Sequence, residues 1–181
     1  MAIILDTNCF SHVFCPNDAR HEDFQPVLEW VIKGKGFFVY GGKKYLDELK
    51  RAKSFLLIFR LLRDIGKAVE IDQEKIDNYQ KSVEQKEQDP DFDDPHLPAI
   101  VAVSHCRLIC SRDERSIRFV TRKDLYPKGF HLPKYYTGIA NISLLKDANI
   151  PKQLLQHKKK IKKVQAERFM AIIDANRAKK N

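Results

Sequence analysis

Four carboxylates lie close to the ends of predicted strands, or in or before predicted helices. Asp6 ends an apolar run at residues 2–5, and Asp113 follows a later apolar run. Glu48 lies in a helical pattern after the second apolar run, and Asp94 precedes an apolar helical pattern. In a parallel sheet the carboxyl ends of the strands meet at one edge, where ligands collect. We therefore expect these acids to share one cleft.

Each acid also has a purely structural interpretation. The three aspartates are of the residue type that caps helices, and Glu48 could pair with a neighbouring lysine. Together, however, four carboxylates at one edge would repel one another unless cations neutralised them. Oxygen ligands in small number, completed by waters, suit Mg²⁺ or Mn²⁺. One or two such ions would activate a water and stabilise the leaving oxygen of a phosphodiester.

The spacing of apolar residues predicts strands that alternate with helices. Short apolar runs typical of buried strands occupy 2–5, 37–40, 67–71, 107–110 and 141–145. Helical spacing is present over 7–14, 24–34, 43–66, 73–88 and 99–106. This alternation predicts an α/β fold with three layers, α/β/α, around a central parallel sheet of four to five strands.

Basic residues are unevenly distributed. The chain has 181 residues, with 33 Lys and Arg, 24 Asp and Glu, and a net charge of +9. Residues 151–181 contain 10 of these Lys and Arg and 2 of these Asp and Glu, so this segment carries +8 and residues 1–150 carry +1. We predict one folded domain over 1–150 and a basic C-terminal helical extension over 151–181. The extension could attract an anionic partner such as nucleic acid, or be a solvated surface only.

Three segments resemble the PIN-domain nucleases: "IILDTN", "YLDELKR" and "DDPHLPAIVAVSHCRLICSRDE". Their order and structural contexts match the family over residues 1–145. The resemblance implies that the metal ligands and catalytic residues are Asp6, Glu48, Asp94 and Asp113. It implies that Thr7, Asn8 and Ser111 orient these carboxylates or the attacking water. The implied cofactor is Mg²⁺ or Mn²⁺, as one or two ions.

The chain departs from the family pattern around the third acid. Pro95 and Pro98 stand where the family has small apolar residues. If the next helix begins at Pro95, Asp94 is its N-cap. If the helix begins at Pro98, Asp94 belongs to the preceding loop. Asp93 is the neighbouring candidate ligand. Ser116 also replaces an aromatic residue that the family often has at this position.

The resemblance implies a metal-dependent endoribonuclease that acts on single-stranded or structured RNA, often as the toxin of a toxin–antitoxin pair or a defence effector. A DNA nuclease that uses the same acidic site on single-stranded DNA is an alternative. So is a non-catalytic module that binds nucleic acid or protein on a PIN scaffold. Further expected partners are an inhibitory protein or a second copy of the chain. A haloacid-dehalogenase-type phosphotransferase is disfavoured because it needs an aspartate where Asn8 stands.

Metal-bound carboxylates do not hold a nucleic-acid strand, so lysines and arginines must do so. The candidates are Lys43, Lys44, Arg112, Arg115, Arg118, Lys158, Lys159, Lys160, Lys162 and Lys163. Each could equally be a solvated surface charge. Tyr135 and Tyr136 could stack on unpaired bases or pack inside their own domain.

No membrane span or secretory signal is predicted. No run reaches the roughly 18 consecutive apolar residues that a membrane helix needs, and the N-terminus lacks the pattern of a signal peptide. The four cysteines are Cys9, Cys15, Cys106 and Cys110. They lack paired CxxC spacing, so we expect small apolar side chains in a reducing cytoplasm rather than a zinc site. Cys9, His12 and Cys15 recur at helical spacing and are the alternative metal group.

Overall fold

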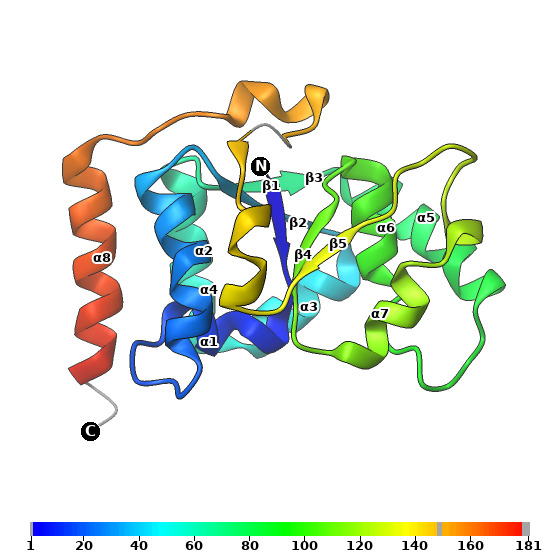
Figure 1. The fold of residues 1–181 in the computed structure, drawn as a ribbon, viewed down its shortest axis with the longest axis horizontal. Coiled ribbons are helices and arrows are strands. Elements are labelled where there is room, and N and C mark those ends of the chain that lie inside the picture. Colours follow the sequence, from blue (N-terminus) through cyan, green and yellow to red (C-terminus); the bar gives the residue numbers. More distant parts are fainter. Residues whose placement is uncertain (1, 148–149, 179–181) are drawn as a thin grey trace.

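The computed structural model describes residues 2–147 and 150–178, with side chains described up to residue 175. Its strands are β1 (Ala2–Leu5), β2 (Phe37–Gly41), β3 (Ala68–Ile71), β4 (Leu108–Cys110) and β5 (Lys134–Tyr136). They form one parallel sheet in the order β3-β2-β1-β4-β5. The prediction of an α/β fold with a central parallel sheet is confirmed (Figure 1).

Helices lie on both sides of this sheet. They are α1 (Phe10–Phe14), α2 (His21–Lys33), α3 (Lys43–Arg51), α4 (Lys53–Asp64), α5 (Gln73–Lys86), α6 (His96–Ser104), α7 (Glu114–Val120) and α8 (Lys163–Ala178). Short 3₁₀ helices occupy Thr7–Cys9, Lys123–Leu125, Ile139–Leu144 and Lys152–His157. Helices α1, α2 and α4 lie on one side of the sheet, and α5 and α6 on the other (Figure 1). Among the described residues, no helix has both the length and the apolar character needed to cross a membrane.

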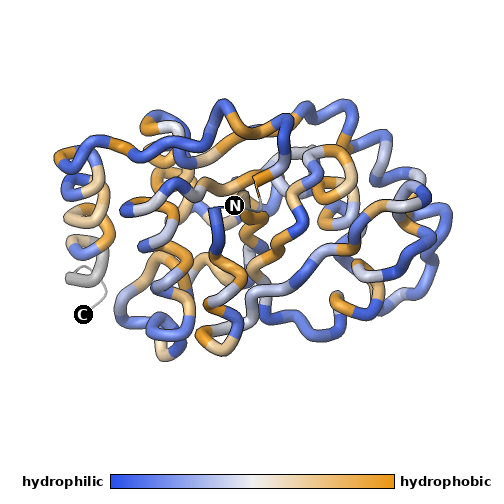
Figure 2. Tube along the Cα trace, turned by 45° about the horizontal axis from the view of Figure 1, so that its top comes forward, coloured by the Kyte–Doolittle hydropathy of each residue, from blue (hydrophilic) through white to orange (hydrophobic). Residues whose placement is uncertain are grey.

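Strand β1 is buried on both faces because helices cover both. All four of its side chains are 0% exposed, which explains its uninterrupted apolar sequence. On one face, the rings of Phe10 and Phe14 pack against Phe59 from α4. Hydrophobic residues accordingly gather in the interior, whereas hydrophilic residues predominate in the outer loops (Figure 2).

The order of the strands changes direction at β1. The chain adds β2 and β3 on one side of β1, then crosses over and adds β4 and β5 on the other. In such sheets a crevice opens where the order reverses, outside the carboxyl ends of the strands. Asp6 directly follows β1 at this crevice, and its backbone N–H donates to the carbonyl of Cys110 at the end of β4, at 3.0 Å.

The predicted last strand at 141–145 is wrong. Residues Ile139–Leu144 form a 3₁₀ helix, in which Ile139 and Ile142 are 54% and 49% exposed. The fifth strand is Lys134–Tyr136 instead, and it buries the rings of Tyr135 and Tyr136. Burial of these rings supports the interpretation that they pack inside their own domain, and it leaves them unable to stack on unpaired bases.

The single helix predicted over 43–66 is also wrong, because two helices occupy this range. The backbone leaves the helical conformation at Ala52, where ψ is 56°. Leu49 of α3 and Phe59 of α4 are both buried. A single straight helix can bury its apolar stripe in one direction only. The break at Ala52 lets α3 and α4 bury their apolar faces in different directions.

The C-terminal extension packs against the rest of the molecule. Leu154, Phe169 and Ile173 are 5%, 3% and 1% exposed. The observed helix is shorter than the helical extension predicted over 151–181, because α8 begins only at Lys163. Some apolar side chains of the extension, which the sequence alone would place on one face of a solvated helix, therefore belong to the core.

A buried lysine joins this extension to the sheet. The Lys67 side chain is 0% exposed, and burial lowers its pKa to about 8. Its ammonium donates to the carbonyl oxygens of Gly34 at 3.1 Å, Gly36 at 3.0 Å and Lys159 at 2.8 Å. These three acceptors compensate for the loss of water around the charge.

Replacing Lys67 by methionine should lower the free energy of unfolding by about 2–4 kcal/mol, because three carbonyl oxygens lose their buried donor. Urea unfolding followed by circular dichroism would measure the change. Lys53→Met, at an exposed position at the start of α4, is the matched control and should change stability by less than about 0.5 kcal/mol. Equal stability of the two variants would show that the ammonium does not hold the extension.

Candidate metal centre

The four predicted acids line one hollow of about 600 Å³ at the carboxyl ends of β1 and β4. Asp6 reaches it from the end of β1 and Glu48 from α3. Asp94 reaches it from the segment before α6, and Asp113 from the start of α7. The other lining residues are Thr7, Asn8, His12, Arg51, Asp93, Arg112 and Arg115. The fold thus brings together acids that are far apart in the sequence.

Asp6 is buried, with 3% of its surface exposed. Its Oδ2 accepts hydrogen bonds from the Ser111 hydroxyl at 2.6 Å and from the Asn8 side-chain amide at 2.8 Å. Burial raises the pKa of Asp6 to about 6, against the opposing effect of the Ser111 hydrogen bond. Asp6 also caps the 3₁₀ helix that follows it. The structural and the functional interpretations of this residue are therefore compatible.

Glu48 is positioned through Tyr45, one turn earlier on α3. The Tyr45 ring is 0% exposed, and its hydroxyl donates to the carbonyl of Leu5 at 2.6 Å. Burial raises the pKa of this phenol well above its usual value, so the hydroxyl keeps its proton. Glu48 Oε2 then accepts a hydrogen bond from the Thr7 hydroxyl at 3.1 Å. The three predicted orienting residues thus contact the predicted ligands, with Thr7 on Glu48 and the other two on Asp6.

Asp113 is linked to Asp6 through a shared serine. The Ser111 hydroxyl that donates to Asp6 accepts from the backbone N–H of Asp113 at 3.0 Å. Asp113 also caps α7 by accepting from the backbone N–H of Arg115 at 3.0 Å, and it pairs with the Arg115 side chain at 3.2 Å. The capping role leaves the carboxylate at the hollow.

The helix after Asp94 begins at His96, between the two predicted starts. Pro95 is its N-cap and Pro98 occupies its third position. The first N–H groups of a helix have no intrahelical acceptor, so proline at this position removes no hydrogen bond. Asp94 lies outside the helix, and its carbonyl accepts from the backbone N–H of Leu97 at 3.1 Å.

The environment of Asp94 disfavours its charge. Burial, together with the charges of Asp6, Asp93 and Glu48, raises the pKa of Asp94 to about 7. Asp93 also lines the hollow but is exposed, and its carbonyl accepts a hydrogen bond from Lys44. Burial and like charges make Asp94, rather than Asp93, the carboxylate that gains most from a nearby cation.

His96 is a candidate that the sequence analysis missed. Its ring is buried against Tyr45, with 6.1 Å between the ring centroids. Nε2 lies 3.8 Å from Glu48 Oε2, and Nδ1 lies 4.0 Å from Asp94 Oδ1. Within the described part of the chain, neither nitrogen has a hydrogen-bond partner. Burial lowers the pKa of His96 to about 3, so the ring is neutral and one nitrogen offers a lone pair.

The sequence signal for His96 is its place two residues after Asp94, in "DDPH". Buried polar atoms are nearly always partnered, so two ring nitrogens that have no partner among the described residues and lie beside carboxylates are unusual. Two groups have ligand atoms within 4.8 Å of one another: Glu48, Asp94 and His96, and Asp93, Asp94 and Asp113. Carboxylate oxygens with one imidazole nitrogen fit a divalent cation.

The alternative metal group of Cys9, His12 and Cys15 is not among these clusters of the described residues. His12 Nδ1 lies 2.6 Å from Asp18 Oδ1 instead, and Cys9 is fully buried. Helical spacing alone therefore did not create a metal site here.

The predicted nucleic-acid-binding residues are not all at the acids. Arg112 and Arg115 line the acidic hollow, as does Arg51, which the sequence analysis did not name. Lys43 and Lys44 line a neighbouring hollow that shares Arg51. Arg118 lines neither of these hollows and pairs with an aspartate 3.1 Å away.

The five lysines of the extension lie at the other end of the sheet. They are Lys158, Lys159, Lys160, Lys162 and Lys163. The Lys159 carbonyl contacts Lys67, which directly precedes β3, and the extension runs along this edge before α8 (Figure 1). Any contact of these lysines with nucleic acid would occur away from the acids.

Comparison of the chain with family models, with curated proteins and with solved structures finds no match. The resemblance to PIN-domain nucleases therefore rests on the sequence motifs.

Without metal, Asp94→Asn should become more stabilising relative to the wild type as the pH rises. The folded-state pKa of Asp94, about 7, exceeds its usual value of 3.8, so the folded protein binds more protons between these pH values. The wild type therefore loses stability as the pH rises through this window, whereas the amide does not titrate. From about pH 4.5 to about pH 7.5 the difference should grow by about 3 kcal/mol.

Thermal unfolding in EDTA across this pH range would measure the effect. Asp64→Asn, at an exposed position on α4, is the matched control. A pH-independent difference between Asp94→Asn and the wild type would contradict a raised pKa of Asp94.

Proposed function

We propose that the protein is a divalent-metal-dependent endonuclease that hydrolyses phosphodiester bonds of single-stranded or structured RNA. The observation that carries this proposal is a buried imidazole that lies beside converging carboxylates and has no hydrogen-bond partner within the described residues. His96 lies within 4.0 Å of carboxylate oxygens of Glu48 and Asp94. A purely structural site would not bury unpartnered nitrogens next to mutually repelling acids.

The donor set supports Mg²⁺ or Mn²⁺ as the cofactor. Glu48, Asp94 and His96 would hold one ion, and Asp6 and Asp113 offer oxygens for the same or a second ion. A bound ion would supply a water of lowered pKa and neutralise charge on a phosphodiester. The carboxylates need fixed orientations for this role, and hydroxyl and amide donors hold those of Asp6 and Glu48.

Cations beside the acids support an anionic polymer as the substrate. Arg51, Arg112 and Arg115 line the same hollow as the carboxylates, where they can contact phosphates on either side of the scissile bond. RNA is proposed over single-stranded DNA through the resemblance to PIN-domain nucleases. The same resemblance supports a cytoplasmic toxin or defence effector whose activity an inhibitory protein partner would restrain.

The purified protein should cleave single-stranded RNA in Mn²⁺ or Mg²⁺, and EDTA should stop the reaction. Asp6→Asn should lower the cleavage rate by about 100-fold or more, because a neutral amide oxygen binds a divalent cation more weakly than a carboxylate does. Asp64→Asn is the control with the same chemical change at an exposed site. Parallel reactions with single-stranded DNA identify the substrate, and unchanged cleavage by Asp6→Asn would refute the proposed site.

His96→Gln should weaken the binding of Mn²⁺ more than that of Mg²⁺, because an imidazole nitrogen favours Mn²⁺ whereas Mg²⁺ prefers oxygen ligands. Calorimetric titration should show the ratio of the two dissociation constants changing by about tenfold. Pulsed electron paramagnetic resonance should detect nitrogen coupling to Mn²⁺ in the wild type and in His131→Gln, but not in His96→Gln. Bound Mn²⁺ without nitrogen coupling in the wild type would exclude His96 as a ligand.

A further inference from the structure

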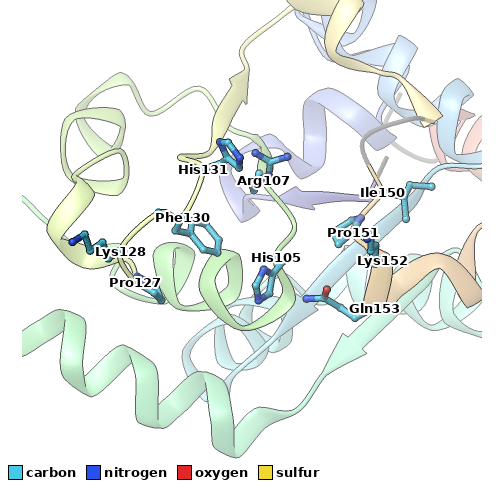
Figure 3. A pocket seen from close by; sticks show the side chains of 11 residues that line it. His105, Arg107, Pro127, Lys128, Phe130, His131, Ile150, Pro151, Lys152 and Gln153 are labelled. Carbon is cyan, nitrogen blue, oxygen red and sulfur yellow. The ribbon is translucent and has the colours of Figure 1, made fainter.

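A second hollow, of about 590 Å³, lies at the opposite end of β4 from the acids (Figure 3). Three segments build it: residues 105–107 before β4, residues 127–131 before β5, and residues 150–153. Because the strands are parallel, their amino ends share one edge of the sheet. The volume is within the range of ligand pockets.

This hollow is lined by cations without acidic partners. Arg107, Lys128 and Lys152 line it, and no carboxylate is among its described lining residues. None of these cations takes part in an ion pair in the described part of the molecule. By contrast, Arg115 in the acidic hollow is paired with Asp113. Three unpaired positive charges around one hollow repel one another and attract an anion.

Aromatic rings form one wall of the hollow. The Phe130 ring stacks on Tyr126, with 5.0 Å between centroids and 8° between planes. The Tyr126 hydroxyl donates to the carbonyl of Val120 at 2.6 Å, which fixes the stack. The His105 ring lies 5.3 Å from that of Phe130. Figure 3 shows these two rings facing Pro151 and Gln153 across the hollow.

The facing wall is also attached to the fold. The Gln153 side-chain amide donates to the carbonyl of Ser104 at the end of α6, at 3.2 Å. Ile150 is 8% exposed and anchors the same segment. Contacts within the protein therefore hold both walls, which lowers the ordering cost of binding.

We infer that this hollow binds a nucleotide anion. The base would lie against the wall of Phe130 and His105, since aromatic rings stack on bases of any sequence. Arg107, Lys128 and Lys152 would contact the phosphates through charge-assisted hydrogen bonds. A free nucleotide and a nucleotide within an RNA strand offer this same chemistry. The inference does not depend on the proposed nuclease activity, because it uses none of the acids.

Calorimetric titration of the full chain tests the inference. EDTA is included so that no metal–nucleotide complex can bind at the acids. ATP should bind about tenfold more tightly than tripolyphosphate, because only ATP has a base. No binding of ATP, or equal affinities for the two ligands, would overturn the inference. Displacement of ATP by a short single-stranded oligonucleotide would show that the site binds a nucleotide within a strand. Without displacement, the site binds a free nucleotide. Either result supports a nucleotide site.

Two variants separate the contributions of base and phosphate. Phe130→Leu keeps the apolar bulk and should lower the affinity for ATP to that for tripolyphosphate, without changing the latter. Arg107→Gln should lower the affinity for both ATP and tripolyphosphate about tenfold. Lys53→Gln, the control, should change neither affinity. A Phe130→Leu variant that weakens both ligands equally would refute the base contact. If circular dichroism shows that Phe130→Leu does not fold, Arg107→Gln, a change at an exposed position, still tests the inference. Unchanged affinity of Arg107→Gln for ATP would overturn the proposed nucleotide site.

Discussion

The burial of the Asp6 carboxylate at the end of β1 is the constraint on which the acidic site depends. A carboxylate removed from water needs hydrogen-bond donors or a cation. Asn8 and Ser111 supply donors from the ends of two neighbouring strands. Ser111 also accepts from the backbone of Asp113, so one hydroxyl places two acids. On the other side, Tyr45 ties α3 to the carbonyl of Leu5 and brings Glu48 into reach.

The sheet separates two edges of opposite charge. Acids gather at the carboxyl ends of β1 and β4, whereas Arg107, Lys128 and Lys152 gather at the amino ends. Strand β4 has three residues, so the two edges are only about 10 Å apart along it. Parallel strands make this separation possible because every crossover returns the chain to the same edge.

Much of the fold was predictable because local patterns carry it. Buried strands such as Ala2–Leu5 are uninterrupted apolar runs, and their order with the helices indicates a parallel sheet. The errors occurred where tertiary packing overrides local pattern. Apolar residues at 141–145 stay largely outside the core, and the break at Ala52 exists because two helices bury different faces. The fifth strand escaped prediction because it has three residues and begins with an exposed lysine.

The amino-acid sequence by itself determined the α/β class and the acids that meet at one edge, since both follow from periodicity and from the parallel order of the strands. Only the tertiary structure decided that His96 is buried beside Glu48 and Asp94, with no hydrogen-bond partner in the part of the chain that the structure describes. It also decided that the basic extension packs at the opposite edge, where Lys67 binds the carbonyl of Lys159. Burial and pairing depend on neighbours far apart in the chain, and no local pattern records them.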